Sequence, residues 1–219
     1  MEHNTLKGII FDLDGTLLDS MGVWYEVDRI FLTRHGITPP EGISEIVKKM
    51  TIDESSDYFI EQFSLPMTSK EVSDEIESIV TEKYEYELPL KPYVKEVLDK
   101  LDEKGIPYGV ATATYPALAV KALERLGVLS RLKFLITEKD VGSGKTSPDI
   151  YYMSAKKLGL GKRQIVVVED TLHSIRTASK AGFFTVGVYD ELVKPEDWKE
   201  IQATATITMK DLRGLISIF

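Results

Sequence analysis

The sequence of 219 residues contains no cysteine, and this absence excludes three kinds of site at once. A disulfide framework, a thiolate zinc site and a cysteine nucleophile all require that side chain. The chain also has no apolar run approaching the roughly 20 residues that span a bilayer. Its start, MEHN, carries neither the basic nor the apolar region of a secretory signal. We therefore expect a cytoplasmic protein with no membrane partner.

Positive charge is the next scarce feature. Lys and Arg together number 27 against 35 Asp and Glu, which gives a formal net charge of -8, and the cations form no long basic run. This balance argues against a nucleic-acid partner. Hydrophobic residues make up 43% of the chain, enough for one large domain or for a core domain with a smaller inserted one.

Short apolar runs alternate with helical patterns in much of the chain, which is typical of a doubly wound α/β fold with a parallel sheet. The first buried strand is expected at 6–11, and Pro89 and Pro92 precede the rest. Further strands are expected at 108–111, 134–136, 165–168, 184–188 and near 204–208. Helices are expected up to 104, at 117–126, at 172–181 and from Pro148 to 158, the last with Ser147 as its N-cap. A short helix closes the chain.

Residues from about 20 to 88 show a helical pattern without strands. Gly36 has the position of a C-cap glycine, and Thr51/Glu54 and Thr68/Glu71 have capping-box spacing. The aromatic residues recur at helical spacing, which favours a role in the core of this segment; they are Tyr58, Phe59 and Phe63. We expect an α-helical cap domain at 20–88, inserted into an α/β core formed by 1–19 and 89–219. The protein is expected to be a monomer or a weak homo-oligomer.

Acidic pairs follow two of the predicted strands: Asp12 and Asp14 after the first, and Glu169 and Asp170 after 165–168. The carboxyl ends of parallel strands meet at one edge of a sheet, so we expect these four side chains to lie together. Each pair alone also fits a simpler role, as a polar Asp-Gly turn or as acids at a helix start. Clustered carboxylates repel one another, however, and their hard oxygens suit Mg²⁺.

Two further motifs fall at the same predicted edge. Lys145 lies in a loop before a helix, where its ammonium could bridge the acids and a phosphate oxygen, although most loop lysines are solvated and this residue alone fits that role better. Thr112 follows the strand at 108–111. Its hydroxyl and the backbone N–H groups beside it, including that of Ala113, could bind phosphate, and a plain helix cap is the alternative.

The order of these motifs along the chain resembles that of the haloacid dehalogenase-like superfamily. The resemblance rests on Asp-Leu-Asp-Gly-Thr-Leu at 12–17, Ala-Thr-Ala-Thr at 111–114, the loop 144–149 and Val-Glu-Asp-Thr at 168–171, and it covers essentially the whole chain. The helical insertion after the first motif is similar to the cap of the subgroup that contains β-phosphoglucomutase and phosphoglycolate phosphatase.

This resemblance implies a Mg²⁺-dependent phosphatase that hydrolyses a small phosphorylated metabolite, such as a sugar phosphate, through an aspartyl-phosphate. It implies these roles: Asp12 as nucleophile, Asp14 as general acid and base, Thr112, Ala113 and Lys145 as phosphate ligands, and Glu169 and Asp170 as metal ligands together with Asp12 and the Asp14 carbonyl.

Single residues distinguish hydrolysis from the other activities of the superfamily. Relatives with mutase activity carry a histidine where this chain has Trp24, so hydrolysis is favoured over mutase activity. Asp14 argues against dehalogenases and phosphonate-cleaving lyases, which lack that acid. Lys48 and Lys49 are interpreted as solvated helix charges, although they and Trp24 are also candidates for contact with the leaving group. One departure is Thr146, where relatives have proline. A catalytically silent binding protein on the same fold is the non-enzyme alternative.

Overall fold

The computed structural model describes residues 6–47, 50 and 52–219. The chain divides into two compact units. One is formed by the residues up to 19 together with 89–219, and we call it the α/β unit; the other is formed by 20–88, and we call it the helical unit. Within the described ranges, no helix is both long enough and apolar enough to cross a bilayer.

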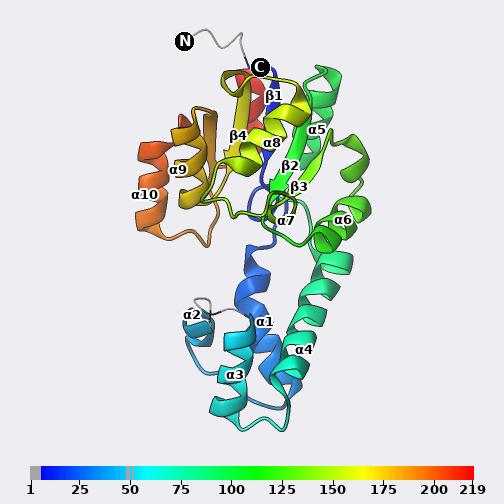
Figure 1. The fold of residues 1–219 in the computed structure, drawn as a ribbon, viewed down its shortest axis with the longest axis vertical. Coiled ribbons are helices and arrows are strands. Elements are labelled where there is room, and N and C mark those ends of the chain that lie inside the picture. Colours follow the sequence, from blue (N-terminus) through cyan, green and yellow to red (C-terminus); the bar gives the residue numbers. More distant parts are fainter. Residues whose placement is uncertain (1–5, 48–49, 51) are drawn as a thin grey trace. The chain divides into compact units, whose positions relative to one another are not determined.

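A parallel sheet forms the centre of the α/β unit (Figure 1). Its six strands lie in the order β3-β2-β1-β4-β5-β6, and each neighbouring pair is parallel. They are β1 (Gly8–Phe11), β2 (Tyr108–Thr112), β3 (Leu135–Thr137), β4 (Ile165–Glu169), β5 (Phe184–Val188) and β6 (Ile207–Met209). All residues of β1, β2 and β4 are buried, as continuous apolar runs predict for a sheet covered on both faces.

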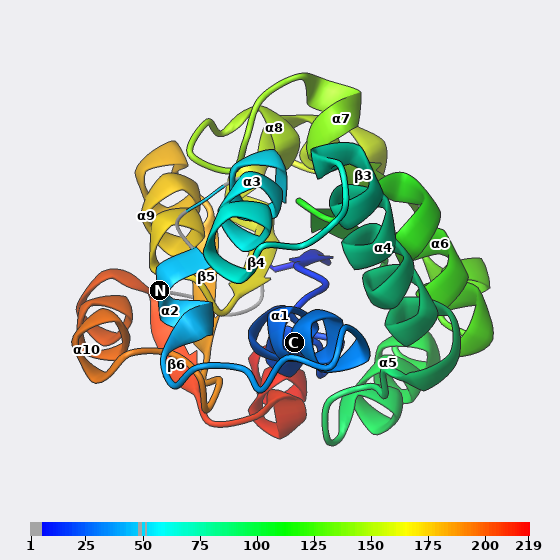
Figure 2. The ribbon, with the colours of Figure 1, turned by 90° about the horizontal axis from the view of Figure 1, so that it is seen from below.

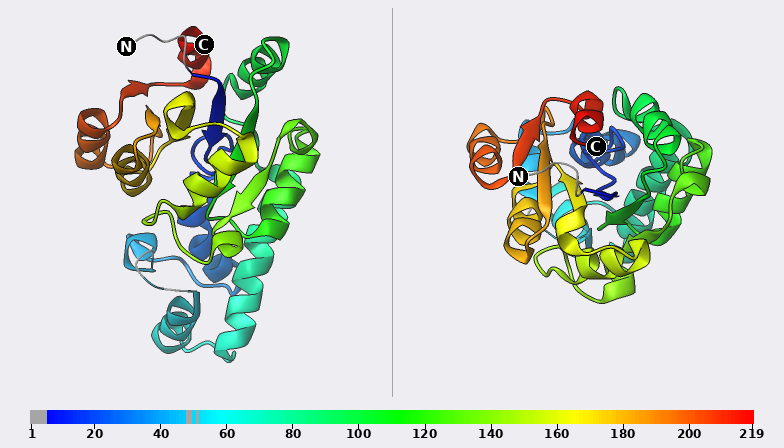
Figure 3. Two further views of the ribbon diagram at one scale, coloured as in Figure 1. Left: turned by 45° about the horizontal axis from the view of Figure 1, so that its top comes forward. Right: turned by 90° about the horizontal axis from the view of Figure 1, so that it is seen from above.

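Helices cover both faces of the sheet. The right-hand view of Figure 3 shows α8 and α9 on one face and α5 and the 3₁₀ helix η5 on the other. The helices of this unit are α5 (Val94–Glu103), α6 (Pro116–Arg125), η3 (Leu129–Arg131), α7 (Glu138–Val141), α8 (Asp149–Leu158), η4 (Lys162–Gln164), α9 (Leu172–Ala181), α10 (Pro195–Thr204) and η5 (Leu212–Ile218). Two-sided cover of a parallel sheet is a doubly wound α/β fold, so the predicted fold class is confirmed.

Two α-helices of this unit, α7 and α10, were absent from the sequence-based expectations. The helix α10 begins with Pro195 at its first position and has Glu196 and Asp197 in its first turn, which are favourable start signals. It extends to Thr204, so β6 begins only at Ile207, later than the predicted strand. The short helix α7 follows β3 directly.

The start of α8 differs from the prediction. Ser147 is not the N-cap: the helix begins at Asp149, and Pro148 occupies the cap position. The Ser147 hydroxyl donates a hydrogen bond to the Asp149 carboxylate at 2.7 Å. The prediction is wrong because the Pro148 carbonyl accepts the first helical hydrogen bond, from the Tyr152 N–H at 3.0 Å, so the helix begins one residue later than predicted.

The helical unit consists of α1 (Met21–Arg34), α2 (Ile43–Val47), α3 (Ile52–Phe63), α4 (Ser69–Glu82) and the π-helical turn η2 (Lys83–Glu87) (Figure 2). The helix α4 packs against α1 and α3. Phe31 stacks on the buried Phe59, with ring centroids 5.5 Å apart. Tyr58 and Phe63 are half-buried and contact the same ring, which agrees with an aromatic core in this unit.

Local signals at two helix ends are also present in the structure. The Thr68 hydroxyl accepts the Glu71 backbone N–H at 3.3 Å, and the Glu71 carboxylate accepts the Thr68 backbone N–H at 2.8 Å, so the predicted capping box forms. Gly36 follows α1 with a φ of 73°, as expected of a C-cap glycine.

Some predictions concern residues that the structure does not describe. Thr51, the first member of the other capping box, lies outside the described residues, and so do Lys48 and Lys49. The side chain of Trp24 in α1 is likewise outside the described part of the chain.

Candidate active site

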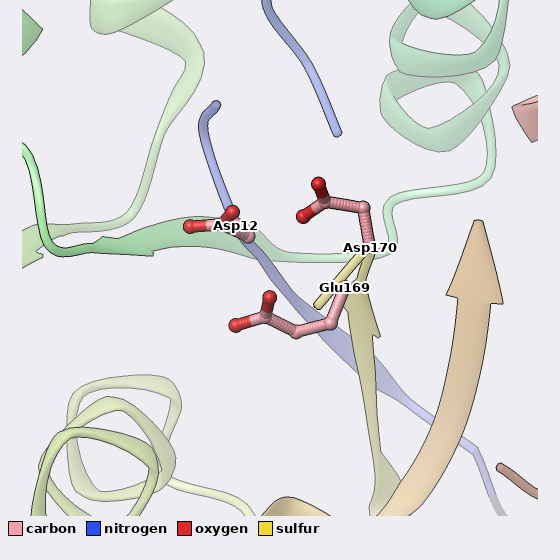
Figure 4. Close-up of side chains that lie close together, drawn as sticks. All are labelled: Asp12, Glu169 and Asp170. Atoms are coloured by element: carbon pink, nitrogen blue, oxygen red, sulfur yellow. The ribbon is translucent and has the colours of Figure 1, made fainter. Parts of the chain in front are cut away.

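Three carboxylates meet at the carboxyl edge of the sheet. Asp12 follows β1, Glu169 is the last residue of β4, and Asp170 comes directly after it. Because β1 and β4 are paired, the Asp12 backbone N–H donates to the Val168 carbonyl at 2.9 Å and brings the two strand ends together. One carboxylate oxygen of each acid lies within 4.8 Å of those of the others, and the three side chains gather in Figure 4. All three acids are buried.

One lysine lies among these acids. Lys145, in the loop between α7 and α8, is only 4% exposed. Its Nζ donates hydrogen bonds to Asp12 Oδ1 and to Glu169 Oε1, the second at 2.7 Å. Its backbone N–H donates to the Glu138 carboxylate at 2.7 Å, which fixes the loop at the first residue of α7. The loop lysine is therefore part of the site and not a solvated charge.

Burial and like charge raise the pKa values of two of these carboxyl groups. Burial is the largest cause, and the charge of Glu169 the second largest, of a rise in the pKa of Asp12 from 3.8 to about 8. The charge of Lys145 lowers this pKa but does not offset the rise. Burial and the charges of Asp12 and Glu169 raise the pKa of Asp170 well above its usual value. Burial lowers the pKa of Lys145, but the two carboxylates outweigh burial, and the net change is upward. One ammonium faces three acids, so ionising all three needs more positive charge.

Two carboxylate oxygens of the site are free to bind a cation that would bring this positive charge. Among the described residues, neither Glu169 Oε2 nor Asp170 Oδ1 has a hydrogen-bond partner, although both atoms are buried. The other Glu169 oxygen accepts hydrogen bonds from Lys145 and, at 3.0 Å, from the Tyr151 hydroxyl. Buried anionic oxygens without donors are costly unless they bind a cation. The acids of this site therefore fit a hard divalent metal ion.

Asp14 lies on the turn that follows β1. Gly15 adopts a φ of 74°, a left-handed conformation that glycine tolerates, and its N–H donates to the Leu18 carbonyl at 3.0 Å. The turn leaves Asp14 half-buried, and the Thr114 hydroxyl donates a hydrogen bond to its carboxylate. The charge of Asp14 also contributes to the raised pKa of Asp12, so the two acids are electrostatic neighbours.

Thr112 and Ala113 occupy the end of β2, next to β1. Thr112 is the last residue of the strand and is buried, and its hydroxyl oxygen accepts the Thr114 backbone N–H at 3.0 Å. Ala113 is exposed and begins the loop toward α6. Thr114 thus connects the predicted phosphate-binding segment with Asp14, because it contacts one through its amide and the other through its hydroxyl.

Sequence reasoning missed three residues that contact the predicted site. They are Thr114 beside Asp14, Tyr151 beside Glu169, and Glu138 beside Lys145. Thr114 and Glu138 each lie within three residues of a predicted strand end, so their position was a usable signal. Tyr151 lies within α8 and reads as a core aromatic, which it also is, with no exposed surface.

Comparisons with known proteins identify the family of this chain. The model of the family described as haloacid dehalogenase-like hydrolase matches residues 9–188. N-acetylmuramic acid 6-phosphate phosphatase of Pseudomonas aeruginosa is 26% identical over 200 residues, covering 90% of this chain and 88% of that protein. Validoxylamine A 7'-phosphate phosphatase of Streptomyces hygroscopicus subsp. limoneus is 30% identical over 213 residues, covering 94% of each.

A solved structure supports the fold independently. The crystal structure of a HAD family hydrolase from Deinococcus radiodurans R1 superimposes with a TM-score of 0.78 at 20% identity, and covers 98% of both chains. The family match spans the sheet from β1 to β5 and includes each of the predicted motifs. This chain belongs to the haloacid dehalogenase-like hydrolase family.

Proposed function

We propose that this protein is a Mg²⁺-dependent phosphate-monoester hydrolase that works through an aspartyl-phosphate on Asp12. The observation that carries the proposal is the cluster of Asp12, Glu169 and Asp170 around the buried Lys145, with two carboxylate oxygens that have no donor among the residues the structure describes. Such a cluster suits a divalent ion and a phosphoryl group better than it suits a folded protein without them. The phosphatase names of the curated relatives support the same activity.

The substrate class is inferred from those relatives. Hexitol phosphatase A of Escherichia coli and phosphorylated carbohydrates phosphatase of Thermotoga maritima are, like the two relatives above, named for small phosphorylated molecules. We infer a sugar phosphate or a similar metabolite for this chain. The helical unit at 20–88 is proposed to act as a cap that selects the leaving group. Cytoplasmic location and a monomeric or weakly oligomeric state stay predictions.

In the first half-reaction, an Asp12 carboxylate oxygen attacks phosphorus and the ester P–O bond breaks. Asp14 gives a proton to the departing oxygen, so an alcohol leaves and Asp12 carries the phosphoryl group. Lys145, which contacts Asp12, is proposed to bind a phosphate oxygen and to offset the negative charge that would repel the nucleophile. Thr112 and the backbone N–H of Ala113 are proposed to bind the remaining oxygens.

In the second half-reaction, Asp14 accepts a proton from a water molecule, whose oxygen attacks the same phosphorus. The bond between Asp12 and phosphorus breaks, and inorganic phosphate leaves. The side chains of Asp12, Glu169 and Asp170, with the Asp14 carbonyl, would bind Mg²⁺. When bound, that ion supplies positive charge to the acids and to the phosphoryl oxygens.

Turnover of p-nitrophenyl phosphate with Mg²⁺ and with EDTA tests the activity, since a catalytically silent binding protein would release no nitrophenol under either condition. Asp12→Asn should abolish turnover. Asp14→Asn should slow hydrolysis of the covalent intermediate, which mass spectrometry would detect as a phosphoryl group on the peptide that contains Asp12. Asp99→Asn is a matched control on α5, because it removes a half-exposed carboxylate that pairs with Arg131. Normal turnover by Asp12→Asn would exclude the covalent scheme.

Release of phosphate from a panel of sugar phosphates, nucleotides and phosphoglycolate tests the substrate class. A sugar phosphate should give the highest kcat/KM. Conversion of one sugar phosphate isomer into another without phosphate release would show a mutase instead.

A further inference from the structure

A lysine outside the predicted motifs contacts the turn that carries Asp14. Lys91 lies three residues before the start of α5, and 76 residues separate it from Gly15. Its Nζ donates a hydrogen bond to the Gly15 carbonyl at 2.9 Å, and its backbone N–H donates to the Leu17 carbonyl, also at 2.9 Å. Lys91 therefore contacts the turn through its side chain and its backbone at the same time.

The Lys91 ammonium is itself fixed by an acid from the loop that follows β5. Asp190, two residues after β5, accepts a hydrogen bond from Lys91 Nζ through Oδ2 at 2.6 Å. Its other oxygen, Oδ1, accepts the Leu192 backbone N–H at 2.9 Å, so the carboxylate has a defined orientation. The side chains of Lys91 and Asp190 are only 15% and 8% exposed. A charge-assisted bond with so little solvent is stronger and better defined than a surface ion pair.

The neighbouring backbone reinforces this arrangement. The Asp19 N–H donates to the Pro89 carbonyl at 3.0 Å, and Leu18 and Leu90 form an antiparallel bridge. The segment after Asp14 and the segment before α5 thus run side by side, with Lys91 adjacent to the turn. Gly15 has a left-handed φ, and a turn of this kind depends on its hydrogen bonds to keep one conformation.

We propose that Lys91 is a positioning residue for Asp14, with Asp190 as the acid that orients it. The inference rests on the proposed function, in which Asp14 gives a proton to the leaving oxygen. By contacting the carbonyl of Gly15, Lys91 fixes the backbone directly after Asp14, while the Thr114 hydroxyl fixes the Asp14 carboxylate. A proton donor has to lie within hydrogen-bond reach of the leaving oxygen, so a small shift of the turn slows this one step.

Two phosphate esters with different leaving groups can isolate that step. p-Nitrophenolate is a good leaving group and departs without a proton donor. The alkoxide of glycerol 2-phosphate is a poor leaving group and must receive a proton as it departs. Lys91→Met removes the ammonium and keeps most of the side-chain stem. It should lower kcat/KM for glycerol 2-phosphate by about tenfold or more relative to kcat/KM for p-nitrophenyl phosphate, as misplaced catalytic groups do. Lys91→Arg, which retains the charge and the donors, should restore much of the ratio.

A matched control is available at the opposite edge of the sheet. Lys162, in the turn before β4, donates to the Ala181 carbonyl at 2.6 Å. Lys162→Met therefore removes another contact between a lysine and a backbone carbonyl, and it should leave the ratio of the two kcat/KM values unchanged. If Lys91→Met fails to fold, Asp190→Asn provides the second variant. It weakens the orientation of Lys91 and should shift the ratio in the same direction by a smaller amount.

The outcomes separate this inference from the proposed function. If the unchanged protein hydrolyses neither ester with Mg²⁺, the proposed function fails and the inference fails with it. If the unchanged protein hydrolyses both, and the Lys91 variant loses activity equally on the two esters, Lys91 has only a structural role and the inference alone is overturned. A double variant adds a second readout: in an Asp14→Asn background, Lys91→Met should no longer change the ratio.

Discussion

Replacing Asp12 by asparagine should stabilise the protein without metal while abolishing its activity. Asp12 is buried beside Glu169, and its pKa is raised from 3.8 to about 8. In the unfolded chain at pH 7 this carboxyl is ionised, whereas in the folded protein it retains its proton at a cost in free energy. At about 1.4 kcal/mol for each pKa unit, the carboxyl destabilises the fold at pH 7 by roughly 4 kcal/mol at most. Asparagine has no such cost.

The pH dependence of this effect has a definite sign. Between pH 4 and pH 8 the folded state binds one more proton at Asp12 than the unfolded state, so this group lowers stability as pH rises. Its unfavourable contribution is absent below pH 4 and complete above pH 8. The difference in unfolding free energy between Asp12→Asn and the unchanged protein should therefore grow from pH 5 to pH 8. Loss of the Asp12 contact with Lys145 will reduce the gain.

Urea unfolding in EDTA at several pH values measures the difference. The control is Asp99→Asn, whose half-exposed surface pair should contribute less than about 1 kcal/mol at any pH. Adding Mg²⁺ should raise the unfolding midpoint of the unchanged protein more than that of Asp12→Asn, because one ligand is missing in the variant. An Asp12→Asn protein that is less stable than the unchanged one at pH 8 in EDTA would refute the electrostatic description of the site.

Substitutions at three further positions test other contacts. Tyr151→Phe removes a hydrogen bond to Glu169 without a change of shape, and it should weaken Mg²⁺ binding, measured by calorimetry, by about tenfold, as loss of a partner of a metal ligand typically does. Lys145→Met leaves the buried acids without a cation and should lower the unfolding free energy in EDTA at pH 8 by about 3–5 kcal/mol, with partial recovery at pH 5 as the acids are protonated. Tyr93 has a left-handed φ of 67°, and its ring lies beneath the Arg213 guanidinium. Glycine and alanine both remove the ring, but only alanine keeps the backbone strain. The Tyr93→Gly protein should therefore have an unfolding free energy in urea about 1 kcal/mol higher than that of Tyr93→Ala.

Most of the fold could be predicted because its signals are local. A strand buried on both faces is a continuous apolar run, and helices such as α9 end at a glycine with a left-handed φ. The motif residues Asp12, Lys145, Glu169 and Asp170 could be grouped because parallel strands end at one edge, and the structure brings them into contact. The roles assigned to them stay predictions until variants are assayed.

The errors have physical causes as well. The start of α8 was misplaced by one residue because the Pro148 carbonyl accepts the first helical hydrogen bond, which the residue pattern Ser-Pro-Asp does not reveal. The helix α10 was missed although Pro195 and two acids mark its start, because Ile201 is its one buried residue and a helix with so small a buried face has little apolar periodicity. Tyr93 could not be anticipated, since its left-handed φ contradicts the preference of a tyrosine.

The residues that support the site are harder to predict than those that form it, and chemistry explains the difference. A phosphoryl-transfer site needs carboxylates and a cation in fixed relation to one another, so few sequences satisfy it and the motif is visible. The orientation of those groups can be secured by any donor that reaches the right atom. Here the donors are Tyr151 for Glu169, Thr114 for Asp14 and Lys91 for the turn beside it, each from a different segment. Because many residues could provide the same contacts, such partners are found only when the fold places distant segments side by side.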